Sequence, residues 1–146
     1  MSAIFIDANI PIYAAGRPHA FKHSCSEILT LVADHRDAFV TDAEVLQDLL
    51  HHYLSQRTWS HGREVTREFA VLMRDRVAPI FADDVEMAAS LADRYSGLSA
   101  RDLVHAAVMS RLGLSDIATA DRAFSQILGF RRLDPADLDS WRDQIS

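Results

Sequence analysis

The stretch AIFIDANIP, residues 3–11, places a carboxylate, Asp7, directly after a short apolar run. Residues 3–6 have the length and composition of a buried strand, and the Asp-Ala-Asn-Ile-Pro that follows ends it. An acid in this position has two explanations. It can cap the helix that comes next, or it can be the first of several acids gathered around a metal ion.

Outward from this stretch, short apolar runs alternate with longer amphipathic ones. Further strands are expected at 38–41, 77–81, 116–120 and 131–133. Helices are expected at 19–37, 41–56, 60–76, 83–97, 99–113 and 135–144. Such alternation predicts a parallel sheet covered on both faces. We therefore expect an α/β fold: a single domain over residues 1–146, with a central parallel sheet of four to five short strands flanked by helices.

The composition is that of a soluble globular protein, with 49% hydrophobic and 25% charged residues in a chain of 146. No apolar run approaches the roughly 18 residues that cross a bilayer, and no signal peptide or membrane association is expected. Cys25 is the only cysteine, which excludes an internal disulfide and fits a cytoplasmic location. The formal net charge of −6 argues against a basic nucleic-acid-binding domain. It does not exclude a nucleic-acid enzyme whose acids bind divalent ions.

Three acids fall at helix starts or strand ends. Asp7 and Asp121 each follow an expected strand, at the edge of an open parallel sheet where ligands bind. Taken singly, each is better explained as an N-cap. Asp102 lies in a helix that is apolar on most sides, so its carboxylate needs a partner or a metal. It also lies three residues after Ser99, the position of a capping-box acid, and the two explanations are equally good.

Two further acids compete in the helix expected at 41–56. Thr41-x-x-Glu44 is a capping-box signature, which gives Glu44 a structural role. Asp48 lies past the first turn, where capping no longer explains it, and a solvated place on the polar side of the helix is its alternative. His105, one turn beyond Asp102, can orient that carboxylate or approach a metal. A histidine with satisfied hydrogen bonds in the core is the favoured interpretation.

Together these acids predict an all-oxygen site, which suits Mg²⁺ or Mn²⁺ better than zinc. Such a site can organise water for attack on a phosphodiester and stabilise the leaving oxygen. The sequence has no glycine-rich phosphate loop, no G-x-S-x-G elbow and no G-x-G-x-x-G fingerprint.

Four segments, in order and over nearly the whole chain, resemble a PIN-domain ribonuclease, most closely a VapC-type toxin of a type II toxin–antitoxin pair. They are FIDANIPIYA (5–14), VTDAEVLQDLLHHY (40–53), SARDLVHAAVM (99–109) and IATADRAFSQILGFRRLDP (117–135).

The resemblance implies that an acidic quartet holds Mg²⁺ or Mn²⁺ and is the catalytic site: Asp7, Asp48, Asp102 and Asp121. It also implies supporting roles for Thr119 and Asn9 beside the quartet. Similar sequences usually carry Glu where this chain has Asp48. The shorter side chain reaches the metal only through water, or Glu44 partly replaces it.

The resemblance further implies endonucleolytic cleavage of RNA (tRNA, rRNA or mRNA) and a cognate VapB-like antitoxin whose C-terminal segment blocks the acidic cleft. Such toxins are usually homodimers, and residues 68–73 offer apolar surface, although core packing explains that segment better. The alternative function is a non-catalytic PIN-like module that binds RNA or protein, which the departure at Asp48 supports. A receiver-type or haloacid-phosphatase-type domain is disfavoured, because Asp7 is followed by Ala and Asn rather than by a second acid.

Overall fold

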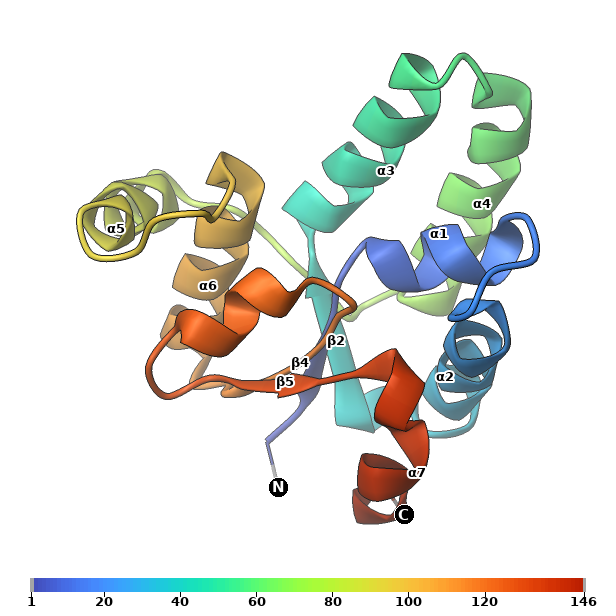
Figure 1. Ribbon diagram of the computed structural model, residues 1–146. Helices are drawn as coiled ribbons and strands as arrows, with labels where there is room; N and C mark the ends of the chain where they lie inside the picture. The colour runs from blue at the N-terminus through green and yellow to red at the C-terminus, as the bar shows by residue number, and fades with distance from the viewer. Residues whose placement is uncertain (1, 146) are drawn as a thin grey trace.

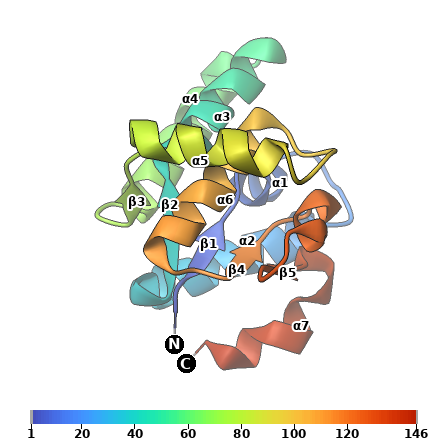
Figure 2. The same cartoon turned by 90° about the vertical axis from the view of Figure 1, so that its left-hand side faces the viewer.

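A computed structural model describes residues 2–145, and within that range five parallel strands form one sheet in the order β3-β2-β1-β4-β5 (Figures 1 and 2). The strands are β1 (Ile4–Ile6), β2 (Phe39–Asp42), β3 (Val77–Ala78), β4 (Asp116–Ala118) and β5 (Arg131–Leu133). The predicted α/β class with a parallel sheet of short strands is confirmed. Chain order reverses between β1 and β4, which is the switch point where open α/β sheets bind ligands.

Helices cover both faces of this sheet. The α-helices of the described residues are α1 (Asn9–Ala15), α2 (Lys22–Asp34), α3 (Ala43–Ser55), α4 (Trp59–Leu72), α5 (Ala82–Ala92), α6 (Ala100–Leu112) and α7 (Leu138–Trp141). Short 3-10 segments are η1 (Arg36–Ala38), η2 (Arg122–Gln126), η3 (Pro135–Asp137) and η4 (Arg142–Gln144). In Figure 1, α1, α2 and α4 lie on one side of the sheet and α5 and α6 on the other. Helices α3 and α4 pack together and project beyond the sheet at the top of that view.

The core forms around the central strand. All three residues of β1 are buried, as the near-continuous apolar run of a parallel strand requires. In the segment 68–73, Phe69 and Met73 are buried in the same core while Val71 is exposed, so core packing accounts for most of that segment. None of the helices within residues 2–145 has the length and apolar character needed to cross a bilayer.

Several expected helices end early, among them the helix expected at 83–97, which stops at Ala92, and two further elements differ more strongly. The strand expected at 77–81 contains only Val77 and Ala78, because Pro79 has no N–H to donate to a ladder. The helix expected at 135–144 is broken into η3, α7 and η4. Asp134 caps the first of these pieces through the Ala136 N–H at 2.9 Å, and the buried Trp141 indole donates to the Asp134 carbonyl at 3.0 Å. These contacts keep the segment packed against the rest of the domain, so it does not form one continuous helix.

Candidate active site

The expected site acids lie where strands end and helices begin. Asp7 follows β1 and Asp121 comes shortly after β4, so both flank the switch point of the sheet. Helix α3 leaves the end of β2 and carries Asp48 in its second turn, and α6 begins near the same edge with Asp102 in its first turn. Because the strands are parallel, their carboxyl ends lie at one edge of the sheet, and all four acids belong to the segments that follow or approach that edge.

Asp7 is buried, and each of its two carboxylate oxygens accepts a hydrogen bond. One carboxylate oxygen accepts the Ala8 N–H at 2.7 Å, and the other accepts the Thr119 hydroxyl at 2.7 Å. Burial raises the pKa of Asp7, against the lowering effects of the His105 charge and of these hydrogen bonds. The N-cap of α1 is Ala8, with no side-chain capping bond, so the explanation of Asp7 as an N-cap is wrong.

Asn9 and Thr119 tie Asp7 to the loop after β4. The Asn9 amide donates to the Thr119 hydroxyl at 2.9 Å and, at 3.4 Å, to the Asp7 carboxylate. The side-chain oxygen Oδ1 of Asn9 accepts the Ala120 N–H at 3.1 Å, and the Thr119 hydroxyl accepts the Asp121 N–H at 3.0 Å. This network fixes the backbone of Asp121 relative to the carboxylate of Asp7.

Asp102 and Asp121 both cap helices and both lie in the acidic cluster. Asp102 forms the expected capping box, since its N–H donates to the Ser99 hydroxyl at 3.1 Å and its carboxylate accepts the Ser99 N–H at 3.4 Å. Asp121 caps η2 through the Ala123 N–H at 2.9 Å. Burial, together with the charges of Asp7 and Asp121, raises the pKa of Asp102 to about 6. The capping and clustering explanations therefore hold together for these two acids.

Asp48 also faces the cluster. One carboxylate oxygen of Asp7, one of Asp48 and one imidazole nitrogen of His105 all lie within 4.8 Å of one another. The Arg101 guanidinium lies 3.5 Å from the Asp48 carboxylate and 3.9 Å from that of Glu44. Asp48 is therefore not a solvated position on the outer side of the helix.

The capping box expected between Thr41 and Glu44 is wrong. Thr41 belongs to β2, and its hydroxyl donates to the Ile6 carbonyl at 2.8 Å. The N-cap of α3 is Asp42, which accepts the Val45 N–H at 2.9 Å. Glu44 is left in the first turn of α3, where partial burial raises its pKa.

Asp42 and His105 form a buried pair that the sequence pattern does not indicate. The second carboxylate oxygen of Asp42 lies 2.9 Å from His105 Nδ1, and both side chains are fully buried. His105 Nε2 points toward Asp7, 3.8 Å from its nearer carboxylate oxygen. Burial alone would lower the pKa of His105, but the hydrogen bond to Asp42 and the surrounding acid charges outweigh it and raise the pKa to about 9. The one available signal was that Asp is itself a strong N-cap residue, so Asp42 could cap α3 in place of Thr41.

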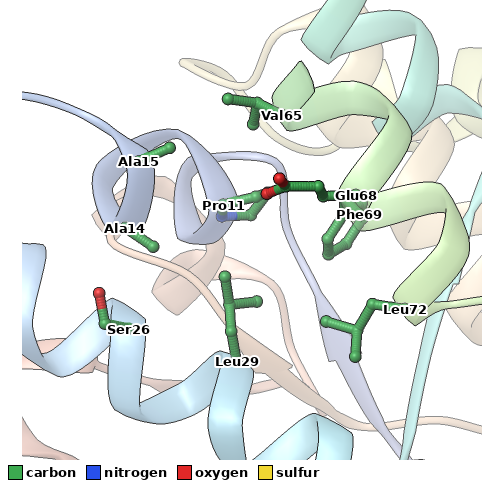
Figure 3. A pocket seen from close by; sticks show the side chains of 9 residues that line it. All are labelled: Pro11, Ala14, Ala15, Ser26, Leu29, Val65, Glu68, Phe69 and Leu72. Atoms are coloured by element: carbon green, nitrogen blue, oxygen red, sulfur yellow. The ribbon is translucent and has the colours of Figure 1, made fainter. Parts of the chain in front are cut away.

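A separate apolar hollow of about 350 Å³ lies between α1, α2 and α4 (Figure 3). Pro11, Leu29 and Phe69 are among its lining side chains, and Glu68 is the charged one. None of the four expected catalytic acids lines this hollow. The acidic cluster and the apolar hollow are therefore two different surfaces.

Comparison with known proteins agrees with this geometry. The PIN domain family model matches residues 4–128. Ribonuclease VapC23 of Mycobacterium tuberculosis is 38% identical over 125 residues, covering 84% of this chain and 95% of the relative. Ribonuclease VapC13 of the same organism is 35% identical over 130 residues, covering 89% and 98%.

Solved structures show the same fold. The crystal structure of VapC20 from Mycobacterium tuberculosis, a sarcin–ricin loop cleaving toxin, matches with a TM-score of 0.69 at 20% identity and covers 84% of this chain and 93% of its own. DNA-bound VapBC from Salmonella typhimurium gives a TM-score of 0.67 at 18% identity, covering 92% and 99%. With the family model matching most of its length and two curated relatives above one-third identity, this chain belongs to the PIN-domain family and, within it, to the VapC ribonucleases.

Proposed function

We propose that Asp7, Asp48, Asp102 and Asp121 are the catalytic residues and metal ligands of a metal-dependent endoribonuclease, the toxin of a toxin–antitoxin pair. The observation that carries this proposal is that Asp7 and Asp48 lie with His105 within 4.8 Å of one another, while Asp102 lies close enough to Asp7 and Asp121 for their charges to raise its pKa. Two of them, Asp7 and Asp102, have raised pKa values because they are buried among other acids. A cluster of this kind calls for a cation to balance it.

The donor set fits Mg²⁺ or Mn²⁺, which prefer carboxylate oxygens. When bound, such an ion polarises the phosphodiester, lowers the pKa of water and stabilises the leaving oxygen. The chain's own residues do the positioning. Asn9 and Thr119 support the site by fixing Asp7 against the loop of Asp121. Arg101, partly exposed beside Asp48, is placed to contact an RNA phosphate.

Asp48 fits the role of the second acid of the quartet better than Glu44 does. Its carboxylate lies in the group formed with Asp7 and His105, whereas Glu44 is one turn nearer the start of α3 and outside that group. The shorter side chain therefore does not keep Asp48 away from the cluster.

We also propose RNA (tRNA, rRNA or mRNA) as the substrate and a VapB-like antitoxin as the partner, with residues 1–146 acting as one PIN-like unit. VapBC from Rickettsia felis and FitAB are structural neighbours of this chain, each solved bound to DNA. Homodimerisation and a cytoplasmic location complete the proposal, and the single cysteine fits a reducing compartment.

The direct test is cleavage of labelled total tRNA and rRNA by purified, antitoxin-free protein with Mn²⁺, with Mg²⁺ and with EDTA. Discrete products that require a metal and disappear in Asp7→Asn are expected. Products that persist in EDTA would overturn the proposal of a metal-dependent site.

The alternative is a non-catalytic module that binds RNA or protein, and the Asp at position 48 is the observation in its favour. Titration of the same protein with Mn²⁺ separates the two functions. A protein that binds RNA but neither binds Mn²⁺ nor cleaves RNA would be the non-catalytic module.

A further inference from the structure

His105 has one buried ring nitrogen with no protein partner. The Nδ1 atom is hydrogen-bonded to Asp42 at 2.9 Å, but Nε2 has no hydrogen-bond partner among residues 2–145. The side chain is fully buried, and its ring packs against Phe5 with centroids 5.2 Å apart. Buried polar atoms are rarely left unpaired, so an orphaned nitrogen of this kind calls for an explanation.

The Asp42 contact fixes which ring nitrogen carries a proton. One oxygen of the Asp42 carboxylate accepts the Val45 N–H, and the other can only accept from His105 Nδ1. Nδ1 is therefore the donor to Asp42, and Nε2 is the nitrogen left to bind a cation. Because the acids around His105 raise its pKa, a bound cation has to displace the Nε2 proton. That nitrogen lies 3.8 Å from an oxygen of Asp7 and is aimed into the acidic cluster.

We propose that His105 Nε2 is a nitrogen ligand of the cation held by Asp7 and Asp48, with Asp42 orienting the imidazole; this rests on the proposed metal site. The three candidate ligand atoms already lie within 4.8 Å of one another. Ligands bind such ions at about 2 Å, which puts neighbouring ligand atoms of an octahedral ion about 3 Å apart, so the group has to close by less than about 2 Å.

The arrangement of Asp42, His105 and the cluster follows a common pattern in metal sites. A ligating histidine usually donates its other ring N–H to a carboxylate, which fixes the tautomer and raises the basicity of the ligand. The pairing also explains why Asp42 is fully buried, since it caps α3 and orients His105 at the same time. A mixed nitrogen and oxygen site favours Mn²⁺ over Mg²⁺, because imidazole is a poor ligand for Mg²⁺.

The test uses Mn²⁺ alone as the probe and pulsed electron paramagnetic resonance as the readout. Mn²⁺ bound to the purified full chain should show ¹⁴N coupling from a coordinated imidazole. His105→Gln should abolish the coupling. Asp42→Asn keeps the ring and the cap on Val45, but its amide donates to Nδ1 and moves the ring proton to Nε2. It should therefore lose the coupling and weaken Mn²⁺ binding by about 10–100-fold.

His23→Asn is the matched control, because His23 is exposed on α2 and pairs with Glu27. This variant should keep the ¹⁴N coupling. Bound Mn²⁺ without ¹⁴N coupling in the unmodified chain would overturn the histidine ligand and leave the carboxylate site intact. Coupling that persists in both His105→Gln and Asp42→Asn would overturn it as well. Asp7→Asn tests the carboxylate site separately, since Mn²⁺ affinity unchanged by that variant would contradict the proposed function itself.

Discussion

Asp7 makes its structural contacts through atoms that an amide can largely reproduce. In Asp7→Asn the side-chain carbonyl still accepts the Ala8 N–H, but the negative charge at the centre of the cluster is gone. We expect RNA cleavage to fall by more than the roughly 10–100-fold that a lost outer-shell partner costs, because the lost group is a proposed ligand.

Initial rates of RNA cleavage and far-UV circular dichroism check this prediction together. The variant should keep the helical spectrum of the parent. A variant that loses cleavage only because it unfolds would show that Asp7 is mainly a structural residue.

A second prediction concerns which residue, Asp48 or Glu44, supplies the second acid of the quartet. Asp48→Glu should keep or raise cleavage, since the longer side chain still reaches the group formed with Asp7 and His105. Glu44→Gln should have a small effect, because Glu44 lies outside that group. Cleavage rates at saturating Mn²⁺ measure both. If Asp48→Glu changes nothing while Glu44→Gln abolishes cleavage, the second acid has been assigned to the wrong residue.

Asp102 and Asp42 show which site roles could be predicted from the sequence and which could not. Asp102 was open to two explanations. The structure shows the capping box and places the same carboxylate near Asp7 and Asp121, while its role as a metal ligand stays a prediction. Asp42 was missed because the capping signature at Thr41 and Glu44 fitted the same helix start one residue earlier. Only the contact with His105, 63 positions away in the chain, reveals the role of Asp42.

At the scale of elements, α3 and α4 pack closely at Gly62. A Cβ atom added there would lie 2.2 Å from the Cβ of Tyr53, which is far inside van der Waals contact. Gly62→Ala should therefore push the two helices apart and destabilise the protein by about 1–3 kcal/mol, toward the upper end of that range. That cost outweighs the gain of about 1 kcal/mol from replacing a glycine inside a helix.

Urea denaturation measures this change, with Arg63→Ala as the control at the next, exposed position of α4. The control should stay within about 0.5 kcal/mol of the parent. An unchanged or increased stability of Gly62→Ala would mean that the helices can separate without losing packing.

Elements with strong periodicity were predictable, and those decided by distant contacts were not. Apolar spacing and Gly113 defined α6 almost to the residue, because Gly113 adopts the left-handed conformation that ends a helix. The last helix was predicted as continuous because its local pattern is helical. Its interruption depends on Trp141 reaching back to Asp134, which local periodicity does not report.

For the whole molecule, the acidic cluster makes stability depend on pH and on metal. The pKa of Asp102 is raised to about 6, above its value in the unfolded chain near 3.9. The folded state therefore binds more protons than the unfolded state between about pH 4 and 6. The contribution of Asp102 to the stability of the metal-free protein should fall as pH rises through that window.

Added Mn²⁺ should reverse this trend, since it binds the deprotonated acids of the folded state. At 100 times its dissociation constant it should add about 2.7 kcal/mol to the free energy of unfolding. Thermal melts from pH 4 to 7 in EDTA and in Mn²⁺ measure both effects, with Asp102→Asn as the comparison. A metal-free profile that Asp102→Asn leaves unchanged would contradict the assignment to Asp102.

For the whole molecule, the order of the strands in the sheet could not be predicted from the sequence. The pattern places Asp7 and Asp121 at the carboxyl ends of strands, but only the pairing of β1 with β4 makes these strands neighbours. That pairing joins residues more than 100 positions apart, and neither periodicity nor composition specifies it. The resemblance in four ordered segments implied the acidic quartet, but it gave no strand order.

The two outer strands restrict how copies of this molecule can associate. On one side, β3 is two residues long and is followed by Pro79, so it offers almost no free backbone for another strand. On the other side, β5 carries Arg131 and Arg132, and charged side chains discourage edge-to-edge pairing. The sheet is thus protected from growing into a neighbour and from the aggregation that follows. A homodimer of this chain would have to form through its helices.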